Sequence, residues 1–271
     1  MRRLPPPLYR VVRRIRVRQE IKDYREREII RRRGHGVTLT LSIQDPLAEG
    51  WYDHDSGGED SEVAACREHG LVEGATVFDI GAHQAVLALV LADIVGPTGR
   101  VIAVEAERHN VTVGRRNLEL NPELPVTLVA AACSGRSGRI AFEDSLNGHI
   151  SAGRIGVRRV RAVTIDELAD TYGVPDVVYL DIEGFELQAL GGAERTLVNG
   201  ATFVIEVHGG GQLEATGGSA VELAHLLASR GYALSYVTEH DAAQHATLRP
   251  VAPAEMPAGV RFHLLAAHQP A

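Results

Sequence analysis

The sequence has few cysteines and almost no lysine. Among its 271 residues the two cysteines, Cys66 and Cys133, lie far apart and show no CxxC or Cys/His spacing. Neither a zinc site nor a disulfide framework is therefore expected, and both thiols are predicted to be small core residues. Lysine is limited to Lys22, which we attribute to coding bias before function.

Long apolar runs are also missing. The longest apolar stretch, residues 85–95, is interrupted by Asp93, so no segment reaches the length that spans a bilayer. Arg2 and Arg3 precede three prolines and more arginine instead of an apolar core, which is unlike a secretory signal. We therefore expect a cytoplasmic protein. The length fits one large α/β domain with an N-terminal appendage, although two small domains remain an alternative.

Charge is distributed unevenly. Residues 1–36 carry 13 basic and 4 acidic side chains, whereas the rest of the chain carries 15 basic and 31 acidic ones. An acidic body does not suit a nucleic-acid groove, so no specific nucleic-acid partner is expected. The basic arm is predicted to be a partly solvated helix that packs on the body. Peripheral contact with RNA, an anionic membrane surface or an acidic partner is the alternative.

The segment Val77–Glu107 has the pattern strand, glycine turn, helix, strand, with Glu105 at the carboxyl end of the second strand. In an open α/β sheet, ligands bind at the carboxyl ends of the strands. Asp79, Gly81 and Glu105 are therefore the first candidates for a ligand site.

The remaining pattern repeats strand and helix and ends in a strand pair, which predicts a mostly parallel sheet with helices on both faces. Thr164 and Glu167 have capping-box spacing at the start of one helix. The chain is expected to divide into an arm (1–36), a strand and helix cover (37–70) and a main domain (71–271). Helices are predicted over 8–33, 61–69, 86–94, 107–120, 165–172 and 219–230, with two short ones in 181–199; strands over 37–43, 77–80, 102–104, 126–130, 139–143, 157–163, 177–180, 203–208, 232–237 and 260–266; and a loop over 50–60.

The first turn lacks glycines that a dinucleotide site needs. In the G-x-G-x-x-G register the residues are Gly81, His83 and Val86, so two of three glycines are missing and pyrophosphate binding is disfavoured. Glu105 stands near the position expected to bind a ribose diol. A ligand with a ribose but no pyrophosphate fits, and S-adenosylmethionine is the obvious member of that class.

A set of motifs follows in order along the chain: 79–83, Glu105, Asn110, 117–121, 164–168, 181–186 and 206–208. Together they resemble the FkbM family of S-adenosylmethionine-dependent methyltransferases, over about residues 50–240. The family's D-x-G-A-N opening appears with His83 in place of asparagine, and Ala85 stands where a further glycine is usual. The resemblance implies a Rossmann-like class I methyltransferase fold with a mostly parallel seven-stranded sheet and an N-terminal helical and strand extension.

The resemblance also implies roles for the first turn and its partner strand. Asp79 and Gly81 would border the methionine end of the cofactor, and Glu105 would accept hydrogen bonds from both ribose hydroxyls. His83 would either contact the cofactor or be a turn histidine that bonds to the backbone. Asp181 belongs to the expected cofactor-binding set as well.

Candidates for catalysis lie at the ends of two later strands. Asp181 ends one strand, while Glu206 and His208 alternate with Val207 and so point to one face. On pKa grounds His208 is the preferred base for taking up the acceptor's proton. The convergence of acids and an imidazole would shift their pKa values or bind a divalent ion, and the sequence leaves metal dependence open.

Structural roles compete with these assignments. Glu186 is expected to be a helix N-terminal carboxylate that accepts backbone N–H groups, rather than a catalytic acid. Glu206 has the alternative of a buried acid paired with arginine. Trp51, Tyr52 and Asp53 would either line an acceptor pocket or anchor their own loop.

The sequence thus predicts a methyltransferase that uses S-adenosylmethionine and acts on an oxygen of a small molecule, sugar or glycan. Two alternatives remain from the residues alone. One is a nicotinamide-dependent oxidoreductase, which the missing glycines disfavour. The other is a cofactor-binding protein without turnover that docks through its basic arm.

Overall fold

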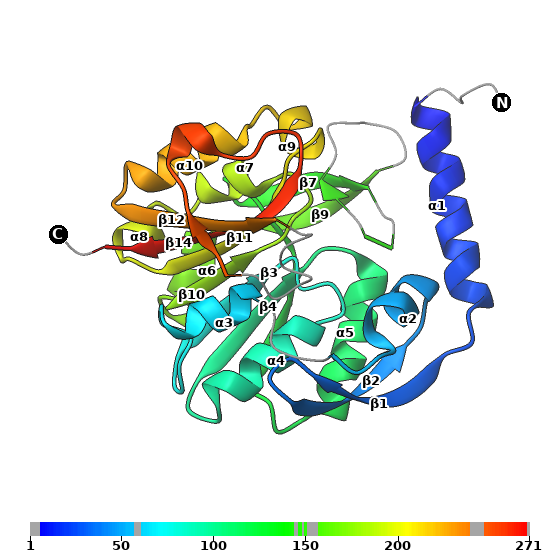
Figure 1. Ribbon diagram of the computed structural model, residues 1–271. Helices are drawn as coiled ribbons and strands as arrows, with labels where there is room; N and C mark the ends of the chain where they lie inside the picture. The colour runs from blue at the N-terminus through cyan, green and yellow to red at the C-terminus, as the bar shows by residue number, and fades with distance from the viewer. Residues whose placement is uncertain are drawn as a thin grey trace.

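The computed structural model describes residues 6–56, 61–143, 146–147, 149–150, 157–238 and 247–269, and its centre is one large sheet (Figure 1). Five strands at one side of this sheet are parallel, and the last three pair in antiparallel fashion. The predicted mostly parallel sheet is confirmed, with an eighth, two-residue edge strand beyond the seven expected. In spatial order the strands are β5 (Val126–Ala130), β4 (Arg100–Glu105), β3 (Thr76–Ile80), β10 (Val177–Leu180), β11 (Thr202–His208), β14 (Arg261–His268), β12 (Tyr232–Thr238) and β13 (Arg249–Pro250).

Helices cover both faces of this sheet because its central strands are apolar on both sides. Along β3, Phe78 and Ile80 pack into one core, whereas Val77 packs into the core on the opposite face. The first core is covered by α6 (Ile165–Tyr172), α7 (Glu186–Leu190), α8 (Glu194–Val198) and α10 (Ala220–Ala228). The second core is covered by α3 (Ser61–Arg67), α4 (Val86–Val95) and α5 (Arg108–Leu120).

A second, four-stranded sheet lies beside the first core. Its strand order is β6 (Ala132–Cys133), β9 (Arg158–Val163), β7 (Gly138–Glu143) and β8 (His149–Ile150). Sequence patterns predicted β7 and β9 but not the two-residue strands. Cys133 of β6 and Val163 of β9 are buried in the first core, and Cys66 is buried in the opposite core, as expected for both thiols. Two further short helices are α9 (Gln212–Ala215) and η1 (Pro253–Glu255).

The N-terminal region corrects two predictions. Helix α1 spans Pro6–Asp23 and stands at the edge of the molecule (Figure 1), but it does not continue to residue 33. Strand β1 (Arg27–Arg33) instead forms an antiparallel hairpin with the predicted strand β2 (Val37–Ile43). The backbone pairing of the hairpin outweighs the helix propensity of an arginine-rich stretch. Part of the expected loop 50–60 is also helical, because α2 spans Pro46–Tyr52, and residues 57–60 lie outside the described part.

Two asparagines, Asn117 in α5 and Asn121 at its C-terminal cap, fasten this hairpin to the body. Asn117 Oδ1 accepts a hydrogen bond from the Ser42 amide (2.8 Å), and its Nδ2 donates to the Gln84 carbonyl (2.9 Å). Asn121 bonds both the amide and the carbonyl of Thr40. The free backbone edge of β2 is thereby satisfied by side chains of a helix, which fixes α2 beside the ends of β3 and β4.

In the part of the chain that the structure describes, no helix is both long and apolar enough to cross a membrane.

The asparagine contacts predict a measurable stability loss. We expect Asn117→Ala to lower the free energy of unfolding by about 2–4 kcal/mol, because a buried amide and a buried carbonyl lose their partners. Urea unfolding of the purified protein measures the change. Glu119→Ala, on the exposed side of the same helix, is the matched control and should shift it by less than about 0.5 kcal/mol. Equal losses in the two variants would contradict the proposed fastening of the hairpin.

Candidate active site

A cavity of about 470 Å³ lies at the carboxyl ends of β3, β4, β10 and β11. This is the edge at which an open α/β sheet binds ligands. Six of the predicted site residues line the cavity, and His208 lies directly behind its wall without lining it. The six are Asp79, Gly81, His83, Glu105, Asp181 and Glu206.

The turn after β3 requires glycine. Gly81 has φ +95°, and a Cβ placed on it would stand 1.6 Å from the Asp181 carbonyl oxygen. The amides of Gly81 and Ala82 both donate to the Val104 carbonyl, at 2.9 and 3.1 Å. The ends of β3, β4 and β10 are thus drawn together at one point, which no side chain at position 81 would allow.

Asp79 brings a buried acid to the cavity. The residue is 4% exposed, and its Oδ2 has no hydrogen-bond partner among the described residues. Burial raises the pKa of Asp79 to about 7, although a bond from the Ala88 backbone opposes this shift. A buried carboxyl oxygen without a partner is costly unless a ligand or a proton satisfies it.

Glu105 links the turn to the end of β4. Its Oε2 accepts the His83 amide (2.9 Å), and its Oε1 accepts the Glu107 amide (2.6 Å). Burial is the main cause that raises the pKa of Glu105 to about 8, and the charge of Glu107 adds to it. Each carboxylate oxygen can still accept a second hydrogen bond, so the side chain can also bind hydroxyl groups in the cavity.

His83 is a buried, neutral turn histidine. Its Nε2–H donates to the Leu146 carbonyl (3.1 Å), which leaves Nδ1 to accept the Tyr52 hydroxyl (2.8 Å). Burial lowers the pKa of His83 to about 4, so the ring is uncharged at neutral pH. Both ring nitrogens are engaged by protein groups, which favours the turn role over cofactor contact through the ring. Its backbone has φ 48°, a left-handed conformation in which histidine is among the better-tolerated residues.

A buried aspartate that sequence patterns did not reveal holds the cover of the cavity in place. Asp45 Oδ1 caps α2 by accepting the amides of Leu47 and Ala48. Its Oδ2 accepts Gln84 Nε2 (2.7 Å) and His109 Nε2 (2.9 Å). Burial opposes the charge of Asp45, yet these bonds lower its pKa overall. Asp45 followed by Pro46 is a helix-start signal that could have predicted α2.

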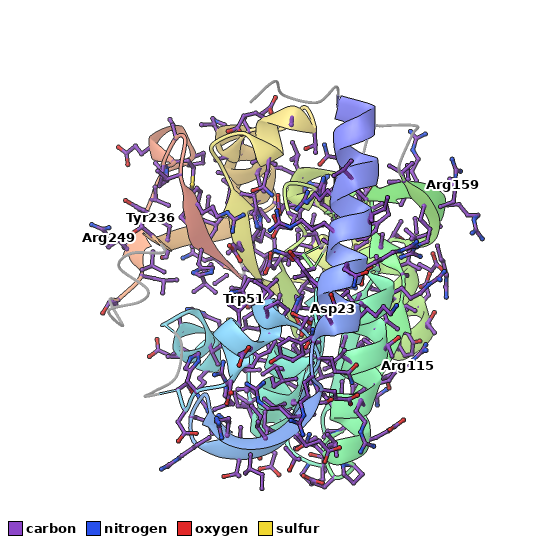
Figure 2. The ribbon with its side chains drawn as sticks, turned by 90° about the vertical axis from the view of Figure 1, so that its right-hand side faces the viewer. Asp23, Trp51, Arg115, Arg159, Tyr236 and Arg249 are labelled. Carbon is purple, nitrogen blue, oxygen red and sulfur yellow. The ribbon has the colours of Figure 1, made fainter. Side chains whose placement is uncertain are left out.

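Helix α2 places two aromatic rings over the first turn. The Trp51 ring centroid lies 5.1 Å from that of His83, and the Tyr52 centroid lies 5.8 Å from it. Trp51 is 41% exposed, and Figure 2 shows it on the face that α1 crosses. Asp53 instead pairs with Arg27 and Arg31 of β1, so it anchors the cover rather than lining the cavity.

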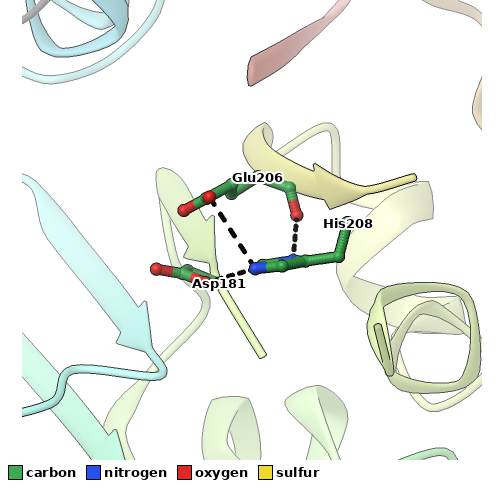
Figure 3. Close-up of side chains that lie close together, drawn as sticks. All are labelled: Asp181, Glu206 and His208. Atoms are coloured by element: carbon green, nitrogen blue, oxygen red, sulfur yellow. Dashed lines mark hydrogen bonds and ion pairs between the residues drawn. The ribbon is translucent and has the colours of Figure 1, made fainter. Parts of the chain in front are cut away.

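The second half of the cavity carries an acidic cluster around His208 (Figure 3). His208 Nε2 lies 3.5 Å from Asp181 Oδ1, 3.7 Å from Glu206 Oε1 and 3.6 Å from Glu183 Oε2. The His208 side chain is 1% exposed, whereas half of the Asp181 side chain is exposed toward the cavity. The three predicted catalytic residues are therefore neighbours, and among them Asp181 is the most accessible to a ligand.

Glu186 and Glu183 surround this cluster. Glu186 Oε1 accepts the Gly184 amide (2.8 Å), in line with its expected backbone role, and also accepts His208 Nδ1–H (2.8 Å). Glu183 accepts bonds from Asn147 and Gln212. Sequence patterns did not reveal these contacts because they depend on left-handed backbone at Glu183 (φ 55°) and Gly184 (φ 95°).

One arginine partly offsets the acidic cluster. Arg261 of β14 lies 3.5 Å from Glu206 Oε1 and 3.4 Å from Glu183 Oε2. The alternative in which Glu206 pairs with arginine is thus present in the structure, beside its position in the cavity wall.

The cluster shifts the ionisation of its members. Burial raises the pKa of Asp181 well above its usual value, and the charges of Glu206, Glu183 and Glu186 raise it further. For His208, burial opposes the charged form, but the bond to Glu186 and the nearby charges outweigh burial and raise its pKa. Asp181 is thus a carboxyl group that readily takes up a proton.

Comparison with known proteins identifies the family. The family described as the methyltransferase FkbM domain matches residues 79–234, which is more than half of the chain. A curated relative is the hexuronic acid methyltransferase AglP of Haloferax volcanii, 27% identical over 182 residues that cover 65% of this chain and 72% of the relative.

Solved structures are similar at lower identity. The methyltransferase FkbM of Methylobacillus flagellatus KT has a TM-score of 0.46 and 19% identity, over 71% of this chain and 43% of that one. The precorrin-6y C5,15-methyltransferase of Geobacter metallireducens GS-15 has a TM-score of 0.45 and 17% identity, over 77% of this chain and 87% of that one.

Because Asp79 is buried, we expect Asp79→Asn to be more stable than the wild type, by an amount that increases with pH. The folded protein keeps the Asp79 proton up to about pH 7, whereas the unfolded chain releases it near pH 3.8. Between these values the free energy of unfolding falls as pH rises, because the unfolded state ionises more easily. We expect the difference in the free energy of unfolding between Asp79→Asn and the wild type to grow in favour of Asp79→Asn by about 1–2 kcal/mol from pH 5 to pH 8.

Urea unfolding at the two pH values measures this gain. Asp170→Asn is the matched control, because Asp170 lies on the surface beside Arg195, far from the cavity lining. It should show no gain that grows with pH. A difference between Asp79→Asn and the wild type that is the same at pH 5 and pH 8 would contradict the raised pKa of Asp79.

Proposed function

Because this chain belongs to the methyltransferase FkbM domain family and is an S-adenosylmethionine-dependent methyltransferase, we propose that it methylates a hydroxyl oxygen of a sugar or glycan. The observation that carries the proposal is the position of Asp181. Its carboxyl group is exposed in the same cavity as Asp79 and Glu105, and its pKa is raised. A proton acceptor therefore stands beside the expected cofactor site.

The first half of the cavity fits the cofactor. Asp79, with Oδ2 unpartnered within the described ranges, would bind the amino group at the methionine end, and Glu105 would accept the ribose hydroxyls. The turn at Gly81 offers backbone close to the ligand without a side chain in the way. When bound, S-adenosylmethionine supplies a methyl group activated by its sulfonium. The backbone bonds of Glu105 hold its carboxylate in place before the ligand arrives.

Asp181 is proposed as the proton acceptor for the acceptor hydroxyl. Methyl transfer to oxygen is a direct displacement, so the protein must align the acceptor and take up one proton. His208 was the sequence-based preference, but its side chain lies almost wholly out of reach of a ligand in the cavity. We therefore assign His208 and Glu206 to positioning Asp181, whose pKa Glu206 raises, and propose that Asp181 itself takes up the proton of the acceptor hydroxyl.

A hydroxyl acceptor fits this site better than a carboxylate acceptor. The named relative acts on a hexuronic acid, which offers both groups. Glu183, Glu186 and Glu206 gather around Asp181, and their charges would repel an incoming carboxylate. A neutral hydroxyl meets less repulsion and can pass its proton to Asp181.

The aromatic cover supports a sugar as the acceptor. Trp51 presents a partly exposed ring at the cavity wall, next to Tyr52. Aromatic faces with a few placed polar groups are typical of small-molecule sites. In this proposal the apolar face of the sugar ring packs on Trp51, and its hydroxyl points toward Asp181.

Calorimetric titration tests the cofactor site. The wild type should bind S-adenosylmethionine and S-adenosylhomocysteine but not NAD. Glu105→Gln should weaken the binding of S-adenosylmethionine about tenfold, because one oxygen that accepts a ribose hydroxyl is replaced by an amide NH₂ group, a loss of about 1.4 kcal/mol. Glu119→Gln, exposed on α5, is the control and should bind like the wild type. Unchanged affinity in Glu105→Gln would place the ribose elsewhere.

Transfer of a labelled methyl group tests the acceptor. Neutral sugars, uronic acids and their glycans are offered as acceptors, and Asp181→Asn should lower kcat by about 10²-fold or more. Asp170→Asn, on the surface, should retain full activity. A methyl ether formed on a hydroxyl survives alkali, whereas a methyl ester on a carboxylate releases methanol. Ester formation, or full activity of Asp181→Asn, would contradict the proposed chemistry.

A further inference from the structure

Three ligand-type side chains from two neighbouring strand ends converge at one side of the cavity. Asp181 follows β10, and Glu206 and His208 end β11, which pairs with β10 in parallel. One carboxylate oxygen of each acid and one ring nitrogen of His208 all lie within 4.8 Å of one another (Figure 3). Such a set has the size of the inner shell of a single cation.

The orientation of His208 gives an independent indication of a ligand. Its Nδ1–H is taken by Glu186 Oε1 (2.8 Å) and the Glu206 carbonyl (3.1 Å). Its Nε2 is directed at the carboxylate oxygens of Asp181 and Glu206, in a side chain that is 1% exposed. Among the described residues Nε2 has no hydrogen-bond partner. A buried ring nitrogen that faces anionic oxygens without a hydrogen bond is unsatisfied unless a proton or a metal cation lies between them.

The separations suit a metal better than a proton. The gaps of 3.5–3.7 Å from Nε2 to the carboxylate oxygens exceed the length of a hydrogen bond to nitrogen, which is about 2.7–3.2 Å. Metal bonds of about 2.1 Å at angles of 90–120° place neighbouring ligand atoms about 3.0–3.6 Å apart. A cation between these atoms therefore needs only small side-chain movements.

The outer contacts match those of a metal-binding histidine. Such histidines usually donate their second ring N–H to a carboxylate, which fixes the tautomer and the ring. Here Glu186 is the carboxylate that accepts the His208 Nδ1–H, and Glu186 in turn accepts a hydrogen bond from the Gly184 amide. Glu183 adds a fourth carboxylate, held by Gln212. Against these four acids the described part of the chain supplies one nearby guanidinium, Arg261.

We propose that Asp181, Glu206 and His208 form a divalent cation site that opens onto the cavity. Two carboxylates with one imidazole suit a cation such as Mn²⁺, which accepts oxygen and nitrogen ligands. The exposed side of Asp181 leaves coordination positions for water or for a ligand oxygen. The site stands without the proposed function. Where that function holds, the cation would bind the acceptor oxygen through one open position and lower its pKa, and the Asp181 oxygen that does not bind the cation would take up the proton.

Titration of the chelator-treated protein with Mn²⁺ tests the site. Electron paramagnetic resonance of free Mn²⁺ counts the bound ion, and the wild type should bind one equivalent. Asp181→Asn and Glu206→Gln should each weaken binding at least about tenfold. Asp170→Asn, a surface acid far from the cavity, should bind like the wild type. Mg²⁺ and Zn²⁺, added as competitors, report the preference among cations.

A nitrogen coupling identifies the ligand directly. The spin-echo spectrum of bound Mn²⁺ should show the ¹⁴N modulation of one imidazole, and His208→Gln should remove it. If His208→Gln does not fold, as judged by circular dichroism, the modulation in the wild type and the loss of binding in Asp181→Asn still decide the matter. Absence of stoichiometric binding, or binding that all three ligand variants retain, would overturn the site.

These measurements are separate from the test of the proposed function. Mn²⁺ binding is measured without S-adenosylmethionine or an acceptor. Mn²⁺ binding with no methyl transfer to sugars would leave the site intact and contradict the acceptor. Methyl transfer that persists after complete chelation, with no Mn²⁺ binding, would contradict the site alone.

Discussion

The contact between Gly81 and the Asp181 carbonyl is the constraint on which the cavity depends. Parallel strands β3 and β10 lie side by side, and the Asp181 amide also donates to the Ile80 carbonyl (2.9 Å). The chain leaving β3 can pass this close to the end of β10 only because position 81 has no Cβ. Any bulk there would push apart the two strand ends that carry Asp79 and Asp181.

How far the sequence predicts the fold depends on where each element obtains its stability. Strands β3, β4, β10 and β11 are buried on both faces, so their apolar runs are visible locally. Strand β1 is different, because its conformation depends on pairing with β2, which in turn packs against α5. Taken alone, this arginine-rich stretch has helical spacing, and the sequence does not show that it pairs with β2. The short strands β6, β8 and β13 carry too few residues for any pattern to appear.

The site follows the same division. Asp181, Glu206 and His208 could be predicted as neighbours, since strand ends meet at one edge of a parallel sheet. The contacts of Glu183 and Glu186 could not be predicted, because they depend on left-handed backbone at Glu183 and Gly184. The first turn departs from the family pattern at His83 and Ala85. Their φ values are 48° and 62°, in the left-handed region that asparagine and glycine adopt more readily. Histidine and alanine keep the same turn at the cost of some backbone strain.

The buried acids are separate in one half of the cavity and clustered in the other, and this difference indicates which ligand groups each half can bind. Asp79 and Glu105 lie on different strands, and burial raises the pKa of each. Each carboxyl group can therefore be neutral without a ligand, or can accept hydrogen bonds from a ligand independently of the other. Donor-rich groups such as an amine and ribose hydroxyls match that half. Around His208 the acids lie together, and protonating one still leaves others charged. A site with that surplus attracts positive charge, so the cation and the proton of the acceptor hydroxyl belong to the same half of the cavity.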